Sequence, residues 1–221
     1  MSSTMIRPGT PQDLDAVADL LTDVFAADPL MRTIAAAAPD ARAALDHLHR
    51  HELAGQYLSP DPTAQSGTRV DVVVDTGGRI IAAALWHAPA SPPAAGADAS
   101  EPAGPIFAGL DVDVLGGAWE LIRLDGAQCE AAQPHDPHWY LYMLAVASQA
   151  RGSGTGTALL RHGLERVDAD GVAAHLESTS PASRRLYERE GFTLTATLDA
   201  PPLPIYWAMT RPAQPTGLNA S

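Results

Sequence analysis

Glycines alternate with small polar residues in one short segment of the chain, Arg151-Gly152-Ser153-Gly154-Thr155-Gly156. Before this segment lies an aliphatic and aromatic run, Trp139 to Val146, which predicts a strand buried on both faces. After it, Thr157 begins a helical pattern of apolar residues. A strand, a glycine loop and a helix in this order favour phosphate binding. Small residues let the backbone approach an anion, and the free amides and the dipole of the first helical turn attract it.

Two common phosphate loops do not fit this segment. A Walker loop requires a lysine near its end, and the chain contains no lysine. A dinucleotide-binding loop reads G-x-G-x-x-G early in a βαβ unit, whereas this one reads G-x-G-x-G late in the chain. The pattern Arg-x-x-Gly-x-Gly, from Arg151 to Gly156, instead resembles the pyrophosphate loop of the GNAT family of N-acetyltransferases, which bind acetyl-coenzyme A (acetyl-CoA). The alternative is a glycine-rich turn that simply precedes a helix.

A second segment resembles the same family. Between Ser180 and Phe192, Leu-Tyr is followed by three residues and then Gly-Phe, one helix and one strand after the first motif, which is where the family carries this signature. The resemblance covers about Trp139 to Arg211. Within it, the sequence is most similar to puromycin N-acetyltransferase and its actinobacterial relatives. The similar runs are Leu176–Pro181, Tyr187–Arg189 and Trp207–Pro212.

The resemblance implies how acetyl-CoA would be held. Main-chain amides of the glycine loop would bind the pyrophosphate, and the backbone of the preceding strand would pair with the pantetheine arm as an added strand does. A bulge in that strand would aim an amide at the thioester oxygen. The family often has asparagine seven residues before its signature tyrosine, whereas this chain has Ser180 there. The expected acetyl-CoA contacts are Leu144, Ala145, Val146, Arg151, Gly152, Ser153, Gly154, Thr155, Gly156, Thr157, Ser180, Ser183 and Tyr187.

Acetyl transfer to an amine also requires a proton acceptor for the amine and a proton donor for the departing thiolate. The resemblance implies that Tyr187 is the general acid, since a phenol with a pKa of about 10 holds its proton more tightly than a thiol. The alternative is a helix tyrosine that packs on the sheet. Glu177 is the candidate base, because a carboxylate inside a strand is unusual unless it is paired, and partial burial makes it a better proton acceptor. The alternative for Glu177 is an ion pair with an arginine.

Aromatic residues are candidates for binding the acceptor amine. Tyr140 and Tyr142 lie two residues apart on the expected central strand, so they share a face and would bind substrate or relay protons. Trp86 ends a predicted strand that approaches the acceptor in this family, and the alternative is a core tryptophan. Glu177 completes the expected substrate contacts, and His175 is a weaker candidate on the same strand face.

Composition limits the partners of the chain. A net charge of −12 repels nucleic acid and anionic membranes and attracts a cationic amine. No apolar run is long enough to cross a membrane, and no signal segment is evident. The single cysteine, Cys129, excludes an internal disulfide and favours a cytoplasmic protein, with a catalytic thiol as the alternative. His47, His49 and His51 lack a zinc-protease motif, so we expect solvated histidines and no metal.

The length of the chain favours one domain, over residues 1–211, with a disordered tail over 212–221. The order of strands and helices, with the resemblance, predicts a single α/β (α+β) domain of the GNAT type: a mixed sheet of about six to seven strands with helices on both faces. Residues 88–137 are the expected substrate-side insertion, opening with a mobile loop over 88–105. The expected strands are 5–7, 70–74, 80–86, 139–146, 172–178, 192–198 and 203–210, and the expected helices 10–28, 39–58, 106–132, 157–168 and 180–191.

These features together predict an acetyl-CoA-dependent N-acetyltransferase. Its acceptor is expected to be the primary amine of a small molecule, such as an antibiotic or a related metabolite. The alternatives are a protein or peptide N-acetyltransferase, which an open acidic groove would favour, and a non-catalytic acyl-CoA-binding module. The chain is expected to be a monomer or a homodimer.

Overall fold

The structure is a computed structural model, which describes residues 4–61, 63, 67–89 and 109–214. Most of the expected mobile loop over 88–105, and the end of the expected tail from residue 215, lie outside the described residues. Within the described part of the chain, no helix is both long and apolar enough to span a membrane.

Seven strands form one mixed sheet, in the order β1-β2-β3-β4-β5-β7-β6. Only β4 and β5 are parallel, and the other neighbouring strands are antiparallel. This arrangement confirms the predicted mixed sheet, because the helical crossover between β4 and β5 makes them parallel. The strands are β1 (Met5–Pro8), β2 (Thr68–Val74), β3 (Ile80–His87), β4 (His138–Val146), β5 (Ala173–Ser178), β6 (Thr193–Leu198) and β7 (Tyr206–Arg211).

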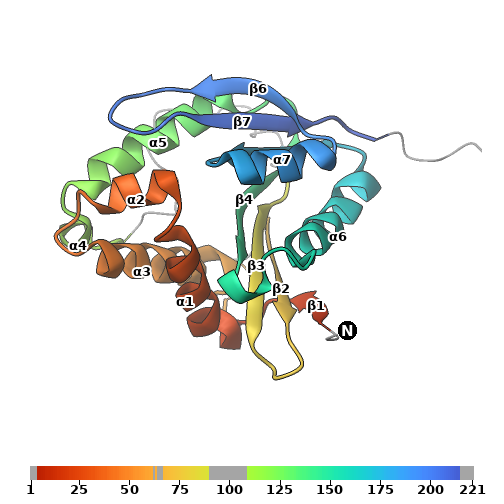
Figure 1. Cartoon of the computed structure of the whole chain (residues 1–221), viewed down its shortest axis with the longest axis horizontal. Coiled ribbons are helices and arrows are strands. Elements are labelled where there is room, and N and C mark those ends of the chain that lie inside the picture. The colour runs from red at the N-terminus through yellow and green to blue at the C-terminus, as the bar shows by residue number, and fades with distance from the viewer. Residues whose placement is uncertain (1–3, 62, 64–66, 90–108, 215–221) are drawn as a thin grey trace, which may run out of the picture.

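Helices cover both faces of the sheet, as the sequence predicts. Figure 1 shows α1 and α3 on one side of β3 and β4, α6 on the other side, and α5 alongside β6 and β7. The helices are α1 (Leu14–Phe25), α2 (Pro29–Ala35), α3 (Ala41–Glu52), α4 (Val112–Leu115), α5 (Ala118–Ala132), α6 (Thr155–Asp170) and α7 (Pro181–Arg189).

The sequence predicts that the first helix ends near Asp28-Pro29 and does not predict the separate helix α2. The Asp28 side chain accepts hydrogen bonds from the amides of Leu30 and Met31, at 3.0 and 3.1 Å. Pro29 occupies the first position of α2, where its missing amide costs nothing. Helix α1 has already ended at Phe25, and Asp28 and Pro29 begin the next helix.

The prediction that the three histidines of α3 are solvated is wrong for His49. This side chain is fully buried, lies near Phe25 and forms a hydrogen bond with Thr22 Oγ1 at 3.1 Å. Burial lowers the pKa of His49 to about 4, so it is neutral and serves the packing of α1 on α3.

Trp86 is the largest side chain with no exposed surface. It makes an edge contact with Trp139, with ring centroids 6.4 Å apart, and lies against Gly163 of α6. It belongs to the main core cluster, which joins the first five strands to α1 and α6. The structure therefore places Trp86 as a core tryptophan on the α6 face of the sheet.

A second core cluster connects α2, α3, α4 and α5 with β6 and β7. The expected helical segment 106–132 breaks at Gly116 and Gly117. Gly116 has a φ of +51°, and a Cβ on Gly117 would lie 3.0 Å from the carbonyl oxygen of Ala37. These close approaches let α4 and α5 pack on the loop that joins α2 to α3. Part of the expected insertion thus lies beside the N-terminal helices.

Candidate active site

The parallel pairing of β4 with β5 is short. It runs from the pair His138 and Ala173 to the pair Leu141 and Leu176, and there it ends. Beyond that point β5 stays paired with β7, while β4 continues to Val146 with a paired strand only on its β3 side. One edge of the second half of β4 is therefore without a strand partner in the described part of the chain.

Alternation along β4 decides which main-chain groups face this open edge. The amide of Ala147 donates to the carbonyl of Ile81, toward β3. Adjacent residues in a strand direct their amides and carbonyls to opposite edges, so those of Val146 and Leu144 face away from β3. The carbonyl of Val146 there accepts a hydrogen bond from Arg151 Nε at 3.2 Å. Of the three expected pantetheine contacts, Ala145 is the one whose backbone groups face β3.

A bulge interrupts β4 just before this edge. Met143 pairs with Leu85 and Leu141 pairs with Trp86, so Tyr142 is an additional residue opposite a single step of β3. Such an extra residue bends a strand and leaves a main-chain group free to point elsewhere. The expected bulge in the central strand is present in the structure.

The glycine loop leaves its main-chain amides free. From Gly152 onward, the first main-chain amide that donates to a carbonyl is that of Ala158, whose acceptor is the carbonyl of Gly154. Among the described residues, none of the amides from Gly152 to Thr157 donates to another protein group. These donors lie at the N-terminus of a 16-residue helix, whose dipole gives them a partial positive charge.

The glycines of this loop are required by its backbone. Gly152 and Gly154 have φ values of +77° and +87°, which favour glycine. A Cβ on Gly156 would lie 3.2 Å from Val146 Cγ2, so the loop passes close to the end of β4. The hydroxyl of Ser153 donates to the carbonyl of Ala150 at 2.7 Å and so supports the turn.

The free main-chain amides from Gly152 to Thr157, here called the amide cup, lie next to the open edge of β4 in this structure. The cup suits a diphosphate, and the edge suits an extended, amide-containing arm. Both features of coenzyme A are thus matched by main-chain groups of the chain.

Ser180 and Ser183 lie where α7 begins. The Ser180 side chain accepts from the amide of Ser183 at 3.2 Å, so Ser180 is the N-cap of α7. The hydroxyl groups of Ser178 and Ser183 are 2.9 Å apart. These serines thus form a small hydroxyl network at the end of β5.

Tyr187 lies on α7 and is 6% exposed, with its ring 5.8 Å from that of Phe192. Its hydroxyl forms no hydrogen bond with another described residue. Burial, with a contribution from the charge of Asp28, raises the pKa of Tyr187 above its usual value. The side chain packs against the sheet, and its hydroxyl is left available to a ligand.

Glu177 is held by two neighbours. Tyr140 Oη donates to its Oε2 at 2.6 Å, and His175 Nε2 lies 3.0 Å from its Oε1. The side chain is 8% exposed. All arginines lie in described residues, and none forms an ion pair with Glu177. The structure brings Glu177, Tyr140 and His175 together, and His175 lies on the strand face of Glu177 that the sequence predicts.

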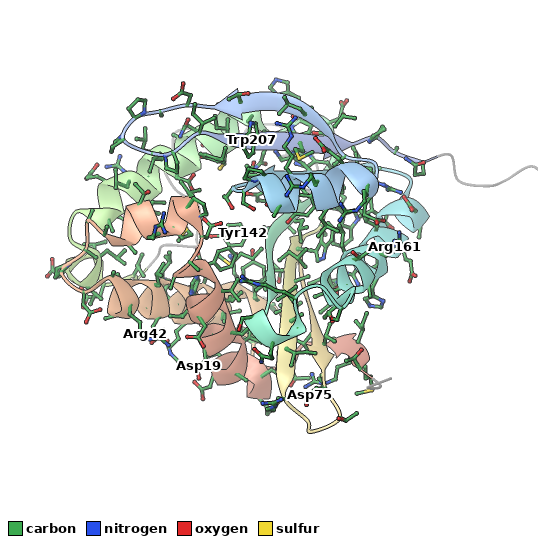
Figure 2. The ribbon with its side chains drawn as sticks, in the orientation of Figure 1. Asp19, Arg42, Asp75, Tyr142, Arg161 and Trp207 are labelled. Carbon is green, nitrogen blue, oxygen red and sulfur yellow. The ribbon has the colours of Figure 1, made fainter. Side chains whose placement is uncertain are left out.

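Tyr142 is hydrogen-bonded to a second carboxylate, which the sequence does not point to. Its hydroxyl donates to Glu52 Oε1 of α3 at 2.6 Å, and Figure 2 shows Tyr142 on the side of β4 that faces the N-terminal helices. The ring of Tyr142 stacks on that of Tyr57, with centroids 6.0 Å apart and planes inclined by 2°. His87 makes an edge contact with both rings. The aromatic cluster, Tyr57, His87, Tyr140 and Tyr142, therefore covers this face of β3 and β4.

A third carboxylate, Asp125 of α5, approaches from the insertion. It accepts a hydrogen bond from the hydroxyl of Tyr206. Burial raises the pKa of Asp125 to about 6, and the charges of Glu177 and Asp28 add to the effect. Burial also raises the pKa of the neighbouring Cys129 thiol, which opposes the thiolate that a nucleophilic role requires.

Asp28 links the two halves of the chain, because its Oδ2 accepts a hydrogen bond from the hydroxyl of Thr179 between β5 and α7. Asp28, Glu52, Asp125 and Glu177 come from four different elements, and none of them forms an ion pair with an arginine. Buried or partly buried carboxylates without an arginine partner favour a cationic ligand.

Comparison with known proteins agrees with these features. The profile described as "Acetyltransferase (GNAT) family" matches residues 69–192, more than half of the chain. A Corynebacterium glutamicum structure named "histone acetyltransferase HPA2 and related acetyltransferase" is 31% identical, with a TM-score of 0.68 and coverage of 98% of this chain and 99% of that one.

Two insect enzymes share the fold at lower identity. Arylalkylamine N-acetyltransferase 2 from Aedes aegypti is 14% identical, with a TM-score of 0.69 and coverage of 96% of this chain and 100% of that chain. Polyamine N-acetyltransferase from Drosophila melanogaster, described as forming N-acetylagmatine, is 20% identical, with a TM-score of 0.63 and coverage of 95% and 100%. With the profile match and the 31% identical relative, the chain belongs to the GNAT family and is an N-acetyltransferase of that family.

Proposed function

We propose that the protein transfers the acetyl group of acetyl-CoA to the primary amine of a small molecule. The observation that carries the proposal is the free amide cup from Gly152 to Thr157 beside an open strand edge and a set of buried carboxylates. The cup and the edge suit the donor, and the carboxylates suit the ammonium form of the acceptor.

Acetyl-CoA supplies an activated acyl group, and the chain supplies the groups that hold it. In the proposal, the loop amides with Arg151 bind the pyrophosphate, and the main chains of Leu144 and Val146 pair with the pantetheine arm. The serines that begin α7, Ser180 and Ser183, flank that arm. The bulge at Tyr142 supplies a free main-chain group near the acyl oxygen.

Proton transfer is assigned to two side chains. Glu177, oriented by Tyr140 and His175, accepts a proton from the ammonium directly or through water. Tyr187 keeps its proton at neutral pH, because burial raises its pKa, and donates it to the departing sulfur. Tyr140 and Tyr142 line the acceptor side. Trp86 is fully buried on the opposite face and has no part in the proposal.

The acceptor is proposed to be a small amine because the aromatic cluster and the carboxylates are buried or only partly exposed. The names of the insect enzymes, which act on arylalkylamines and polyamines, agree with this choice. The sequence similarity to puromycin N-acetyltransferase favours an antibiotic or related metabolite as the finer proposal. A cytoplasmic monomer or homodimer remains the proposed setting.

The test is the release of free thiol from acetyl-CoA across a panel of small amines and one lysine-containing peptide. We expect turnover with small amines, and loss of about 100-fold or more in kcat for Tyr187→Phe, with the dissociation constant for CoA unchanged. Turnover of the peptide alone would favour the protein acetyltransferase. Tight CoA binding without turnover of any amine would favour the binding module.

A further inference from the structure

Glu52 is a buried carboxylate to which the proposed reaction gives no role. It is the last residue of α3, is 2% exposed, and accepts one hydrogen bond, from Tyr142. Its second oxygen, Oε2, has no hydrogen-bond partner in the described part of the chain. A buried acceptor left without a donor is unfavourable, so a ligand that supplies a donor at Oε2 is stabilised there.

No protein cation neutralises Glu52. Every positively charged side chain except histidine is an arginine, and the arginine nearest in sequence, Arg50, is held by Asp15, Asp19 and Asp46. None of the ion pairs formed by the other arginines involves Glu52. The positive charge that would compensate an ionised Glu52 must therefore come from a ligand.

Aromatic rings next to Glu52 favour a cation of a particular kind. Tyr142 stacks on Tyr57, and His87 makes edge contacts with both rings. Aromatic faces beside a carboxylate attract an ammonium group, through the ring quadrupole and the negative charge together. Burial lowers the pKa of His87 to about 4, so this imidazole is neutral and does not repel a cation.

Glu52 is also the second of two matched tyrosine–carboxylate pairs. Tyr140 donates to Glu177 of β5, and Tyr142 donates to Glu52 of α3, each at 2.6 Å. The two tyrosine rings lie on one face of β4, with centroids 6.0 Å apart. Two carboxylates, one from β5 and one from α3, thus bind neighbouring tyrosines of β4. The proposed proton transfer involves only Glu177.

We propose that the acceptor carries two ammonium groups, one acetylated beside Glu177 and Tyr140 and the other bound by Glu52 against the rings of Tyr57 and Tyr142. This inference rests on the proposed function and specifies its acceptor as an aliphatic diamine or longer polyamine. Glu52 binds the end of the acceptor that does not react, so it acts in recognition and not in proton transfer.

The experiment compares matched amines that differ only in the second charge. Thiol release is measured with 1-aminobutane and 1,4-diaminobutane, and with 1-aminopentane and 1,5-diaminopentane, at saturating acetyl-CoA. We expect kcat/KM to be about 30-fold or more higher for a diamine than for its monoamine, because the second ammonium forms a buried ion pair. This comparison uses only the wild-type protein, so it does not depend on whether a variant folds.

Glu52→Gln then assigns the preference to this residue, since the amide keeps the shape and an acceptor for Tyr142. We expect the variant to lose the diamine preference, so that its kcat/KM for the diamine falls to about that for the matched monoamine. Asp46→Asn is the control, because Asp46 lies on the same helix and is partly exposed. This variant should keep the diamine preference.

The outcomes separate the two proposals. Equal turnover of monoamine and diamine by wild type would leave the proposed function intact and overturn the Glu52 subsite. A Glu52→Gln variant that kept the preference would also overturn it. No turnover of any amine would overturn the proposed function, and the subsite with it.

Discussion

Gly163 of α6 lies directly against the indole of Trp86: a Cβ on Gly163 would be 2.5 Å from Trp86 Cζ2 and 2.7 Å from Nε1. The indole has no exposed surface and is held by Trp139, so it has no free space into which to move. The contact sets how closely α6 approaches β3. Since the glycine loop begins α6, it also helps to position the amide cup.

Gly163→Ala should therefore destabilise the protein, although alanine favours a helix by about 1 kcal/mol over glycine. We expect the overpacking to outweigh this gain and to lower the melting temperature by several degrees. Gly126→Ala in α5 is the matched control, because no atom lies within 4 Å of its added Cβ, and it should raise the melting temperature. Similar shifts for the two variants in calorimetry would contradict the packing argument.

Gly154→Ala should weaken CoA binding. Gly154 has a φ of +87°, which costs an alanine about 1–2 kcal/mol, and relaxation of that strain would disturb the amide cup. We expect a rise of about tenfold in the dissociation constant measured by calorimetric titration with CoA. Gly78→Ala, at a φ of +79° in the turn between β2 and β3, carries the same strain and should leave CoA binding unchanged. An equal loss in both variants would indicate general destabilisation.

Glu177→Gln tests the proton acceptor. The amide can still accept from Tyr140, but it cannot take a proton from the ammonium, so kcat should fall about 100-fold while the KM for acetyl-CoA stays nearly constant. Glu188→Gln on α7, where Glu188 forms a partly exposed ion pair with Arg184, is the control and should retain full activity. An undiminished kcat for Glu177→Gln in steady-state kinetics would move the base elsewhere.

Glu52 should make stability fall as the pH rises. Burial raises its pKa from 4.5 to about 7 in the folded chain. Between those values the unfolded chain loses the proton that the folded chain retains, so the folded state loses up to about 3 kcal/mol by pH 8. Glu52→Gln has no such proton. Urea unfolding should therefore show this variant gaining stability over wild type between about pH 5 and pH 8, and a difference independent of pH would rule the effect out.

The sequence predicts the central part of the fold because local patterns determine it. The β-branched and aromatic content of the run before the glycines favours a buried strand, and the glycines with a following helical pattern favour the loop. Ser180 as an N-cap and Gly191, with a φ of +91°, likewise mark the ends of α7. Each of these features needs only neighbouring residues to be recognised.

The missed features depend on contacts between distant residues. His49 and Glu52 look like exposed polar positions of a helix, and their burial follows only from the packing of α3 on α1 and β4. Glu52 lies four residues after Leu48, on the buried side of α3, and this spacing was the available signal. Asp28-Pro29, a common helix start, was likewise the signal for α2.

Trp86 and His87 show why it is hard to predict from sequence which face of the sheet a side chain takes. Both residues end β3, and as neighbours in a strand their side chains take opposite faces of the sheet. Trp86 lies on the α6 face, and His87 contacts Tyr140 and Tyr142. A shift of the strand register by one residue exchanges the two faces, and the register is known only once the neighbouring strand is known.

β7 lies between β5 and β6, although both of those strands precede it along the chain. During synthesis on the ribosome, both β5 and β6 therefore emerge before β7, the strand with which each of them pairs. The second half of the sheet cannot assemble until residues 206–211 have been translated. Completion of the site around Glu177 of β5 is thus tied to the late part of biosynthesis, so a nascent chain interrupted earlier would carry the glycine loop and β1 to β4 without the paired β5, β7 and β6.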